Sequence, residues 1–342
     1  MENFQTARLE NYLGQALAKD GTVEVHNLQD ITSGWQSQIL SFDLHVTRRG
    51  SITRQGCVAR LFPGKLAARQ AAYEFRGMQT LKKSDYPVPE VFIFCTDEQV
   101  MGQPFLIMER IDGPLLIDKI TQAESASQRA SYLDLFCKLF VNLHHLDWRP
   151  FADDSFQLES SAPYQFIDAW LRDAKNALER FSLPGAKDII SWVADNRLRS
   201  GIQRASVLHW DFHPGNIIMR TEQSPVVIDW SGWKISDFRF DLSWTLLLAT
   251  AYWGNAERDL ILQLYEKHSG RMVEALDVFE VTACARRLYD VLGSMALGAD
   301  SFGMRPEAVH LMQAQIDHLK IVYDLFVERT GIRIQEIELV FE

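Results

Sequence analysis

The chain has 342 residues, of which 47% are hydrophobic and 23% charged, proportions typical of a soluble globular protein with room for two lobes. Its formal net charge of −10 argues against a general nucleic-acid-binding protein, because phosphate backbones attract clustered lysine and arginine. The longest apolar run, residues 244–253, is too short to cross a bilayer, and the first ten residues do not resemble a secretory signal. We therefore expect a cytoplasmic protein without a nucleic-acid or membrane partner.

The first third of the chain alternates β-like segments with turns, and one long helical segment interrupts them. Val, Ile, Phe and Thr are frequent in the β-like segments, as in antiparallel strands. The predicted strands are residues 22–28, 38–46, 51–62, 86–94 and 103–113, with a hairpin turn at 48–51. Apolar residues recur at helical spacing over residues 65–83, which predicts the main helix of this part.

Beyond about residue 115 the pattern becomes mostly helical. Predicted helices cover 127–148 and lie near 163–183, 186–199, 256–268, 273–297 and 306–329. One short β-rich part, around residues 208–230, lies between them. The sequence thus predicts an α+β fold, with a small antiparallel β-lobe at 1–111 and a larger helical lobe at 112–342. The four cysteines are far apart in the chain, which favours reduced, buried thiols over a zinc site or a disulfide framework.

The segment "LHWDFHPGNIIMR", residues 208–220, concentrates polar side chains that could carry chemistry. His209 and His213 are four residues apart, but Pro214–Gly215 argue against a helix, and the H-E-x-x-H pattern of zinc proteases is absent. No G-x-S-x-G signature supports a nucleophile–base pair. A loop that handles phosphates fits better, with the histidines bracing it.

Phosphoryl transfer needs a carboxylate to orient the attacking hydroxyl, and Asp211 lies in a loop where it could do so. It also needs oxygen ligands for Mg²⁺, and Asn216 and Asp229 are of the right type. They are thirteen residues apart, on either side of two β-like runs. A hairpin between them would bring the two side chains together.

"HWDFHPGNII" followed by "VVIDW" resembles the catalytic and metal-binding segments of the aminoglycoside phosphotransferase/choline kinase-like family, which shares the bilobal protein kinase-like fold. The resemblance implies that Asp211 is the catalytic base and that Asn216 and Asp229 hold Mg²⁺. It implies transfer of the γ-phosphoryl group of ATP to a hydroxyl of a small molecule.

The resemblance extends over most of the chain. "CVARLFPG" is similar to the strand whose basic residue contacts the nucleotide phosphates, here Arg60, and "AAYEFRGMQTL" to the helix that supplies its acidic partner, here Glu74. The backbone from Glu109 to Ile111 would meet adenine. "DFRFDLSW" also has a family counterpart, which implies a structural role for Asp241.

Three positions depart from the family pattern. Trp210 stands where glycine is commonest, and Arg60 where classical kinases have lysine. Arginine keeps the positive charge and can contact phosphate or carboxylate through two nitrogens. The turn that would cover the phosphates, "TSGWQSQ", has a single glycine, Gly34.

Two other functions remain open. One is a catalytically weak or inactive nucleotide-binding pseudokinase that acts as a sensor, which Arg60 and the glycine-poor turn motivate. The other is transfer to a protein hydroxyl, which the helical insert at 115–200 and the lack of a long activation segment after Asp229 argue against. The acceptor itself stays undetermined: aminoglycosides, choline, sugars and amino-acid alcohols all fit the charge. Trp230, Trp233, Trp244 and Trp253 are expected to be core residues rather than a cage for a quaternary amine.

Overall fold

The computed structural model describes residues 2–17, 21–31, 37–154, 156–158, 162–181, 184–298, 310 and 316–341. The chain forms two compact units, each described by itself below. Unit 1 contains residues 1–116 and 217–231, and unit 2 contains residues 117–216 and most of the chain after 232. The division into lobes at residues 111 and 112 stays a prediction. Within the described residues, no helix is long and apolar enough to cross a membrane.

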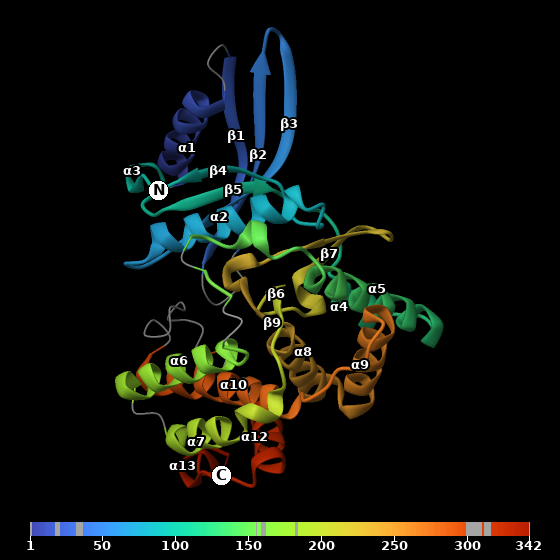
Figure 1. The fold of residues 1–342 in the computed structure, drawn as a ribbon. Coiled ribbons are helices and arrows are strands. Elements are labelled where there is room, and N and C mark those ends of the chain that lie inside the picture. Colours follow the sequence, from blue (N-terminus) through green and yellow to red (C-terminus); the bar gives the residue numbers. More distant parts are fainter. Residues whose placement is uncertain are drawn as a thin grey trace. The chain divides into compact units, whose positions relative to one another are not determined.

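Unit 1 is built on a five-stranded antiparallel sheet in the order β1-β2-β3-β5-β4 (Figure 1). Its strands are β1 (Gly21–Asp30), β2 (Gln38–Arg48), β3 (Ser51–Leu61), β4 (Val91–Cys95) and β5 (Phe105–Glu109). The predicted turn joins β2 to β3, whose pairing runs without a break from Arg48–Ser51 to Gln38–Leu61. Alternate residues of β2, namely Leu40, Phe42 and Leu44, are buried, as expected for a strand with one face on a core.

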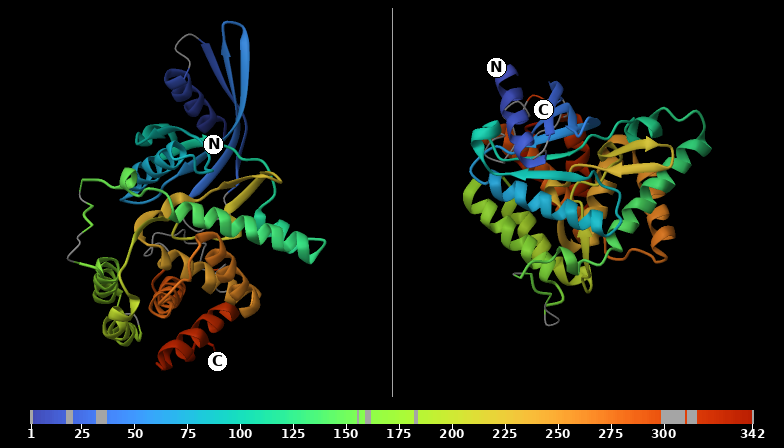
Figure 2. Two further views of the ribbon diagram at one scale, coloured as in Figure 1. Left: turned by 45° about the vertical axis from the view of Figure 1, so that its right-hand side comes forward. Right: turned by 90° about the horizontal axis from the view of Figure 1, so that it is seen from above.

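Two long helices accompany this sheet, α1 (Glu2–Leu17) and α2 (Ala67–Lys83), with a short α3 (Glu98–Met101). The sequence predicted α2 but not α1. The helix α1 lies beside β1 (Figure 2), and its Leu9 and Leu13, one turn apart, are fully buried in the core under the sheet. Among residues 6–17 of α1, Leu9 and Leu13 are the two fully buried side chains, which explains why its apolar pattern is weak in the sequence.

The hairpin β7 (Ile217–Thr221) and β8 (Ser224–Val227) also belongs to unit 1. Its pairing starts at Ile217–Val227, so the predicted hairpin between Asn216 and Asp229 is confirmed. Backbone hydrogen bonds from Met219 N–H to the Pro114 carbonyl and from Val227 N–H to the Pro87 carbonyl fix the hairpin to the N-terminal segment. The hairpin, although it lies in the second half of the chain, thus belongs to the unit that contains the sheet.

Unit 2 is mostly helical. Its helices are α5 (Ala126–His144), α6 (Gln165–Phe181), α7 (Ala186–Asn196), α8 (Phe238–Trp253), α9 (Asn255–Ser269), α10 (Asp277–Leu297), α12 (Ile316–Thr330) and α13 (Gln335–Glu338), and α4 (Leu116–Thr121) precedes them. A two-stranded sheet of β6 (Ala205–Leu208) and β9 (Lys234–Asp237) lies among them. The fold class is thus as predicted, an antiparallel β part followed by a mostly helical part.

The helix α8 was not predicted, and its burial explains why. Its residues from Arg239 to Leu247 are all buried, so the segment has no polar face and no clear helical period in its apolar residues. It begins at Phe238, and the carboxylate of the preceding Asp237 accepts the Arg239 N–H and caps the first turn. A helix of this kind is recognised from its neighbours rather than from its sequence pattern.

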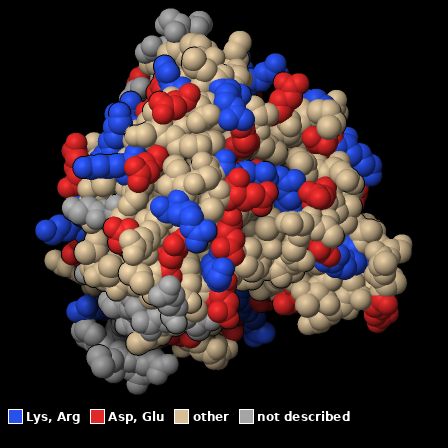
Figure 3. Space-filling view, turned by 90° about the horizontal axis from the view of Figure 1, so that it is seen from below, with Lys and Arg blue, Asp and Glu red and all other residues tan. Residues whose placement is uncertain are grey.

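The four cysteines are buried and unpaired, as predicted. Trp230, Trp233 and Trp244 are buried core residues, whereas Trp253 is partly exposed. On the face shown in Figure 3, acidic and basic side chains of the described residues alternate over short distances.

Candidate functional site

In unit 1, Arg60 on β3 connects two carboxylates that are far apart in the chain. Its Nη1 is 3.2 Å from Oε1 of Glu74 on α2 and 2.8 Å from Oδ1 of Asp229, and its Nε donates to Ser37 Oγ at 3.2 Å. Arg60 and Glu74 are 7% and 1% exposed. The pairing of Arg60 with Glu74 implied by the family resemblance is therefore present, and it includes Asp229 as well.

The buried network shifts the pKa values of its members. Burial raises the pKa of Glu74 to about 7, although Arg60 lowers it, and the Asp229 carboxylate raises it further. Burial lowers the pKa of Arg60, but the two carboxylates outweigh burial and hold it above its ordinary value. Oε2 of Glu74 is buried and has no hydrogen-bond partner in the described part of the chain. Arg60 therefore stays charged, whereas burial and the unbonded Oε2 make the ionised form of Glu74 unfavourable.

Asp229 follows β8 in an uncommon backbone conformation, with φ of +63°. The next residue, Trp230, is fully buried, packs against Tyr86 and donates its indole N–H to the Val227 carbonyl, which anchors this conformation. The Asp229 side chain is 41% exposed, and its Oδ1 accepts from Arg60 and from Ser231 Oγ. Because a carboxylate has two oxygens with about four acceptor positions, further coordination through Asp229 is sterically and chemically possible.

The predicted adenine-binding backbone lies at the end of β5. The Glu109 N–H donates to the Glu90 carbonyl, and the Arg110 N–H donates to the Gly56 carbonyl. The Ile111 N–H donates to none of the described residues, so it is the amide of the three that is available to a nucleotide base. Gly34, the remaining predicted nucleotide contact, lies outside the described residues.

In unit 2, Asp211 lies in the loop between β6 and the short 3-10 turn Pro214–Asn216. Trp244 donates its indole N–H to Oδ1 of Asp211 at 2.7 Å, and Nε2 of His213 is 3.7 Å from Oδ2. Burial raises the pKa of Asp211, but His213, Arg286 and the Trp244 N–H together hold it well below its ordinary value. The carboxylate is therefore ionised and oriented at neutral pH.

The loop around Asp211 is held by Asp241, which is fully buried on α8. The carboxylate of Asp241 accepts the backbone N–H groups of His209 and Trp210, each at 2.8 Å. Nδ1 of His209 in turn accepts the Asp211 N–H at 3.3 Å. Asp241 and His209 thus fix the backbone of the loop through hydrogen bonds, as the sequence analysis expected.

Asn216 is oriented by the same loop. Its Nδ2 donates to the Asp211 carbonyl at 3.0 Å, and its backbone N–H donates to the His213 carbonyl at 2.9 Å. Since the amide nitrogen is engaged, the amide oxygen faces another direction and remains an acceptor. The structure therefore brings Asp211 and Asn216 together in unit 2, and Arg60, Glu74 and Asp229 together in unit 1.

The sequence analysis missed three side chains around Asp211 and its neighbour Trp210. Trp244 was interpreted as core only, although it follows Asp241 by three residues and so lies on the same side of α8. Arg286 of α10 stacks over Trp244 at 3.8 Å and donates to the Trp210 carbonyl. The ammonium of Lys234 lies 3.4 Å from the centre of the Trp210 ring. Only the spacing of Trp244 could have been noticed in the sequence, because Arg286 comes from a distant helix.

The family model "Phosphotransferase enzyme family" matches residues 42–279, which is more than half of the chain and includes Arg60, Glu74, Asp211, Asn216 and Asp229. The chain belongs to this family. A kinase-type phosphotransferase is therefore the general class of the region that residues 42–279 form.

Solved structures of phosphotransferases share the fold. A candidate aminoglycoside phosphotransferase from Ralstonia eutropha JMP134 matches with a TM-score of 0.62 at 16% identity, over 93% of this chain and 98% of that chain. Macrolide 2'-phosphotransferase MphH from Brachybacterium faecium matches with a TM-score of 0.57 at 16% identity, over 90% and 97%. A thermostable mutant of aminoglycoside phosphotransferase APH(4)-Ia, solved with ADP and hygromycin B, gives 0.58 at 15% identity, over 92% and 98%. These likenesses establish the kinase-like fold.

Curated relatives have longer chains. Acyl-CoA dehydrogenase family member 10 of Mus musculus is 26% identical over 241 residues, which are 70% of this chain and 22% of the relative. Acyl-CoA dehydrogenase family member 11 of Homo sapiens is 23% identical over 229 residues, 66% of this chain and 29% of the relative. The chain thus spans less than a third of these relatives.

Proposed function

We propose that the protein is an ATP- and Mg²⁺-dependent phosphotransferase that transfers the γ-phosphoryl group to a hydroxyl of a small molecule. The observation that carries the proposal is the buried ion network of Arg60 with Glu74 and Asp229. An arginine on the surface pairs with solvent and needs no buried carboxylate. A cation that binds phosphate must instead be held in a fixed position, and two carboxylates hold Arg60 in this way.

The donor set fits Mg²⁺, which prefers carboxylate and amide oxygens and keeps some of its waters. Asn216 offers an amide oxygen because its nitrogen is bound to the Asp211 carbonyl. Asp229 offers a half-exposed carboxylate whose Oδ1 is already oriented by Arg60 and Ser231. The bound ion would neutralise negative charge on the nucleotide phosphates. Arg60 would contact the phosphates, while Glu74 limits the rotation of its guanidinium.

Asp211 would orient the acceptor hydroxyl and receive its proton. The strongly lowered pKa makes Asp211 a weak base, which suits phosphoryl transfer, because a loose transition state requires little proton removal before the bond to phosphorus forms. Trp244 and His213 hold the two carboxylate oxygens, so the direction of the remaining lone pairs is defined. The Ile111 N–H would donate to the adenine ring.

Charges of both signs lie around Asp211. Arg286 and Lys234 both lie against Trp210, and Arg286 also lowers the pKa of Asp211. The carboxylates of Asp241 and Asp290 act on both of these cations. The acceptor panel therefore has to include neutral, anionic and cationic alcohols.

The test is phosphoryl transfer from γ-labelled ATP across a panel of sugars, hydroxy acids, amino alcohols, choline and aminoglycosides. Asp211→Asn and Asp229→Asn are expected to lower turnover of an identified acceptor by at least about a thousandfold. Asp324→Asn is the matched control, because Asp324 is an exposed aspartate on α12 that pairs with Lys320. Turnover like that of the unmodified protein in either site variant would contradict the assignment.

The alternative is a nucleotide-binding sensor without transfer activity. One observation favours it: Arg60 occupies an oxygen of Asp229, the predicted metal ligand. Measuring Mg²⁺-dependent ATP affinity together with slow ATP hydrolysis separates the two functions. Tight ATP binding without hydrolysis and without transfer to any alcohol of the panel would support the sensor.

A further inference from the structure

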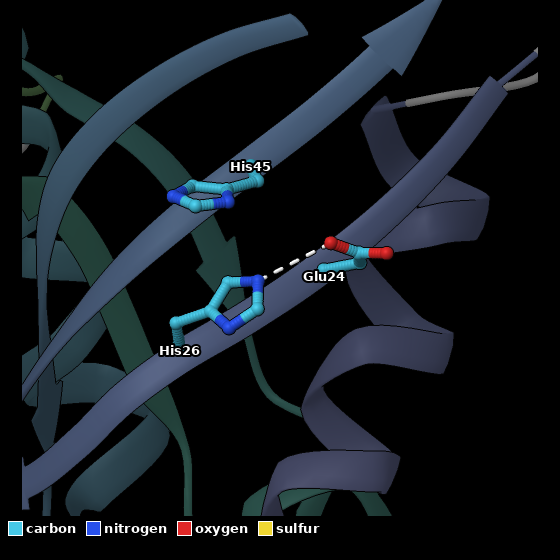
Figure 4. Close-up of side chains that lie close together, drawn as sticks. All are labelled: Glu24, His26 and His45. Carbon is cyan, nitrogen blue, oxygen red and sulfur yellow. Dashed lines mark hydrogen bonds and ion pairs between the residues drawn. The ribbon is translucent and has the colours of Figure 1, made fainter.

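A second cluster of chemically competent side chains lies on the sheet of unit 1, outside the residues discussed so far. It consists of Glu24 and His26 on β1 and His45 on β2, and their ligand atoms all lie within 4.8 Å of one another (Figure 4). Neither the phosphotransferase chemistry nor the core of the sheet uses these residues.

The strand register explains why the three side chains meet. Glu24 and His26 are two residues apart and so point to the same face of β1. His45 is the direct cross-strand partner of Glu24, which places it on that face too. The intervening pair, Val25 and Leu44, is buried on the opposite face, so the cluster lies on the solvent side.

We propose that Glu24, His26 and His45 form a binding site for a divalent transition-metal ion of the zinc type. Two imidazoles and one carboxylate are the ligands that zinc accepts, with one position left for water. The separation of 3.2 Å between His26 Nε2 and Glu24 Oε2 matches the roughly 3.3 Å between two ligands that are each about 2.0–2.1 Å from a tetrahedral metal. The ring centres of His26 and His45 are 4.3 Å apart, and one ring nitrogen of His45 lies within 4.8 Å of the other two ligand atoms, so a small movement of the side chain would bring the second imidazole to the metal.

The surroundings suit a cation that exchanges with solvent. Side-chain exposure is 46% for His26 and 62% for Glu24, which leaves an open path for the ion. Asp43 is the cross-strand partner of His26 and adds a negative charge, although its carboxylate also binds Asn27 and Arg110. The site differs in kind from the proposed Mg²⁺ site, because imidazole nitrogen favours zinc, copper and nickel over Mg²⁺.

A metal bound here would join β1 to β2. The ion binds the folded protein and stabilises it by mass action. Its ligands come from both strands, so this stabilisation requires β1 and β2 to be paired in the native register. Binding needs imidazole nitrogens that carry no proton, so protons compete with the metal for both histidines.

The experiment titrates ZnCl₂ into the metal-stripped, tag-free chain in excess Mg²⁺, which occupies oxygen-ligand sites. We expect one zinc ion per chain at this cluster and a loss of affinity of at least about tenfold in His26→Gln and in His45→Gln. His310→Gln is the matched control, because it removes an exposed histidine elsewhere in the chain, and it should bind zinc normally. All three variants change exposed or half-exposed side chains, and circular dichroism without metal checks that they fold.

Two further measurements separate this site from other weak sites. Cu²⁺ bound to the unmodified chain should show electron paramagnetic resonance splitting from two imidazole nitrogens, and the splitting should disappear in the double variant His26→Gln/His45→Gln. Zinc should raise the midpoint of thermal unfolding in the unmodified chain but not in the double variant. Zinc binding that is absent, or that keeps its affinity in the double variant, would overturn the proposal.

Discussion

Glu74→Gln should change how the stability of the protein depends on pH. The substitution keeps the size of the side chain and removes its charge. In the folded protein the pKa of Glu74 rises from its ordinary value of 4.5 to about 7, chiefly because the side chain is 1% exposed. The folded state therefore binds a proton more tightly than the unfolded state does.

The sign and the size follow from proton linkage. A raised carboxyl pKa contributes stability that is fully present below pH 4.5 and is lost as the pH rises to about 7. At about 1.4 kcal/mol for each unit of pKa, the rise from 4.5 to about 7 corresponds to about 3–4 kcal/mol. Glu74→Gln has no group that titrates here, so its stability relative to the unmodified chain should rise by about 3–4 kcal/mol between pH 4.5 and pH 8.

Urea unfolding at several pH values, followed by circular dichroism, measures the difference between the two proteins. Titration of the Glu74 carboxyl by ¹³C NMR measures the pKa directly. Glu328→Gln is the matched control, because its side chain is 70% exposed and its stability should stay within about 0.5 kcal/mol at every pH. If the free energy of unfolding changes with pH in the same way in Glu74→Gln and in the unmodified chain, Arg60 fully compensates the burial of Glu74. That result would refute the reasoning.

Three further substitutions test other parts of the structure. Trp244→Phe removes the N–H that binds Asp211 and should lower turnover roughly tenfold, and because the side chain is buried the smaller ring should also cost about 1–3 kcal/mol of stability. Lys234→Met should stabilise the protein by about 1–2 kcal/mol near pH 7, because burial lowers the pKa of Lys234 to about 8, and the gain should vanish as the pH rises to about 10.5. Gly113→Ala should cost more than about 2 kcal/mol, since its Cβ would lie 2.2 Å from the Met219 carbonyl oxygen at a φ of +154°.

Each of these has a matched control in the chain. Trp253→Phe changes a partly exposed tryptophan of the same helix and should leave turnover unchanged. Lys320→Met removes an exposed lysine and should not alter the pH dependence above pH 8. Gly14→Ala should be neutral or slightly stabilising, because nothing lies within 4 Å of its added Cβ. If a control variant has the same effect as its test variant, the role assigned to the corresponding contact is wrong.

The fold could be predicted where local patterns agree with tertiary packing. The strand β2 alternates buried and more exposed residues, and the β7–β8 hairpin separates Asn216 from Asp229 by the length of two short strands. The helix α8 could not be found in this way, because a helix that is buried on all sides has no period to detect. Among residues 6–17 of the helix α1 only Leu9 and Leu13 are fully buried, so its signal was weak as well.

The sequence alone determined the residue types proposed for phosphoryl transfer, their order and the two motifs that hold them, because these depend on near neighbours in the chain. The tertiary structure decided which partners each of them has. Arg60 reaches Asp229 across 169 residues, and Trp244 reaches Asp211 across 33. It also brought His26 and His45 together through the β1–β2 register. Such contacts depend on how distant elements pack, and no spacing within one segment encodes them.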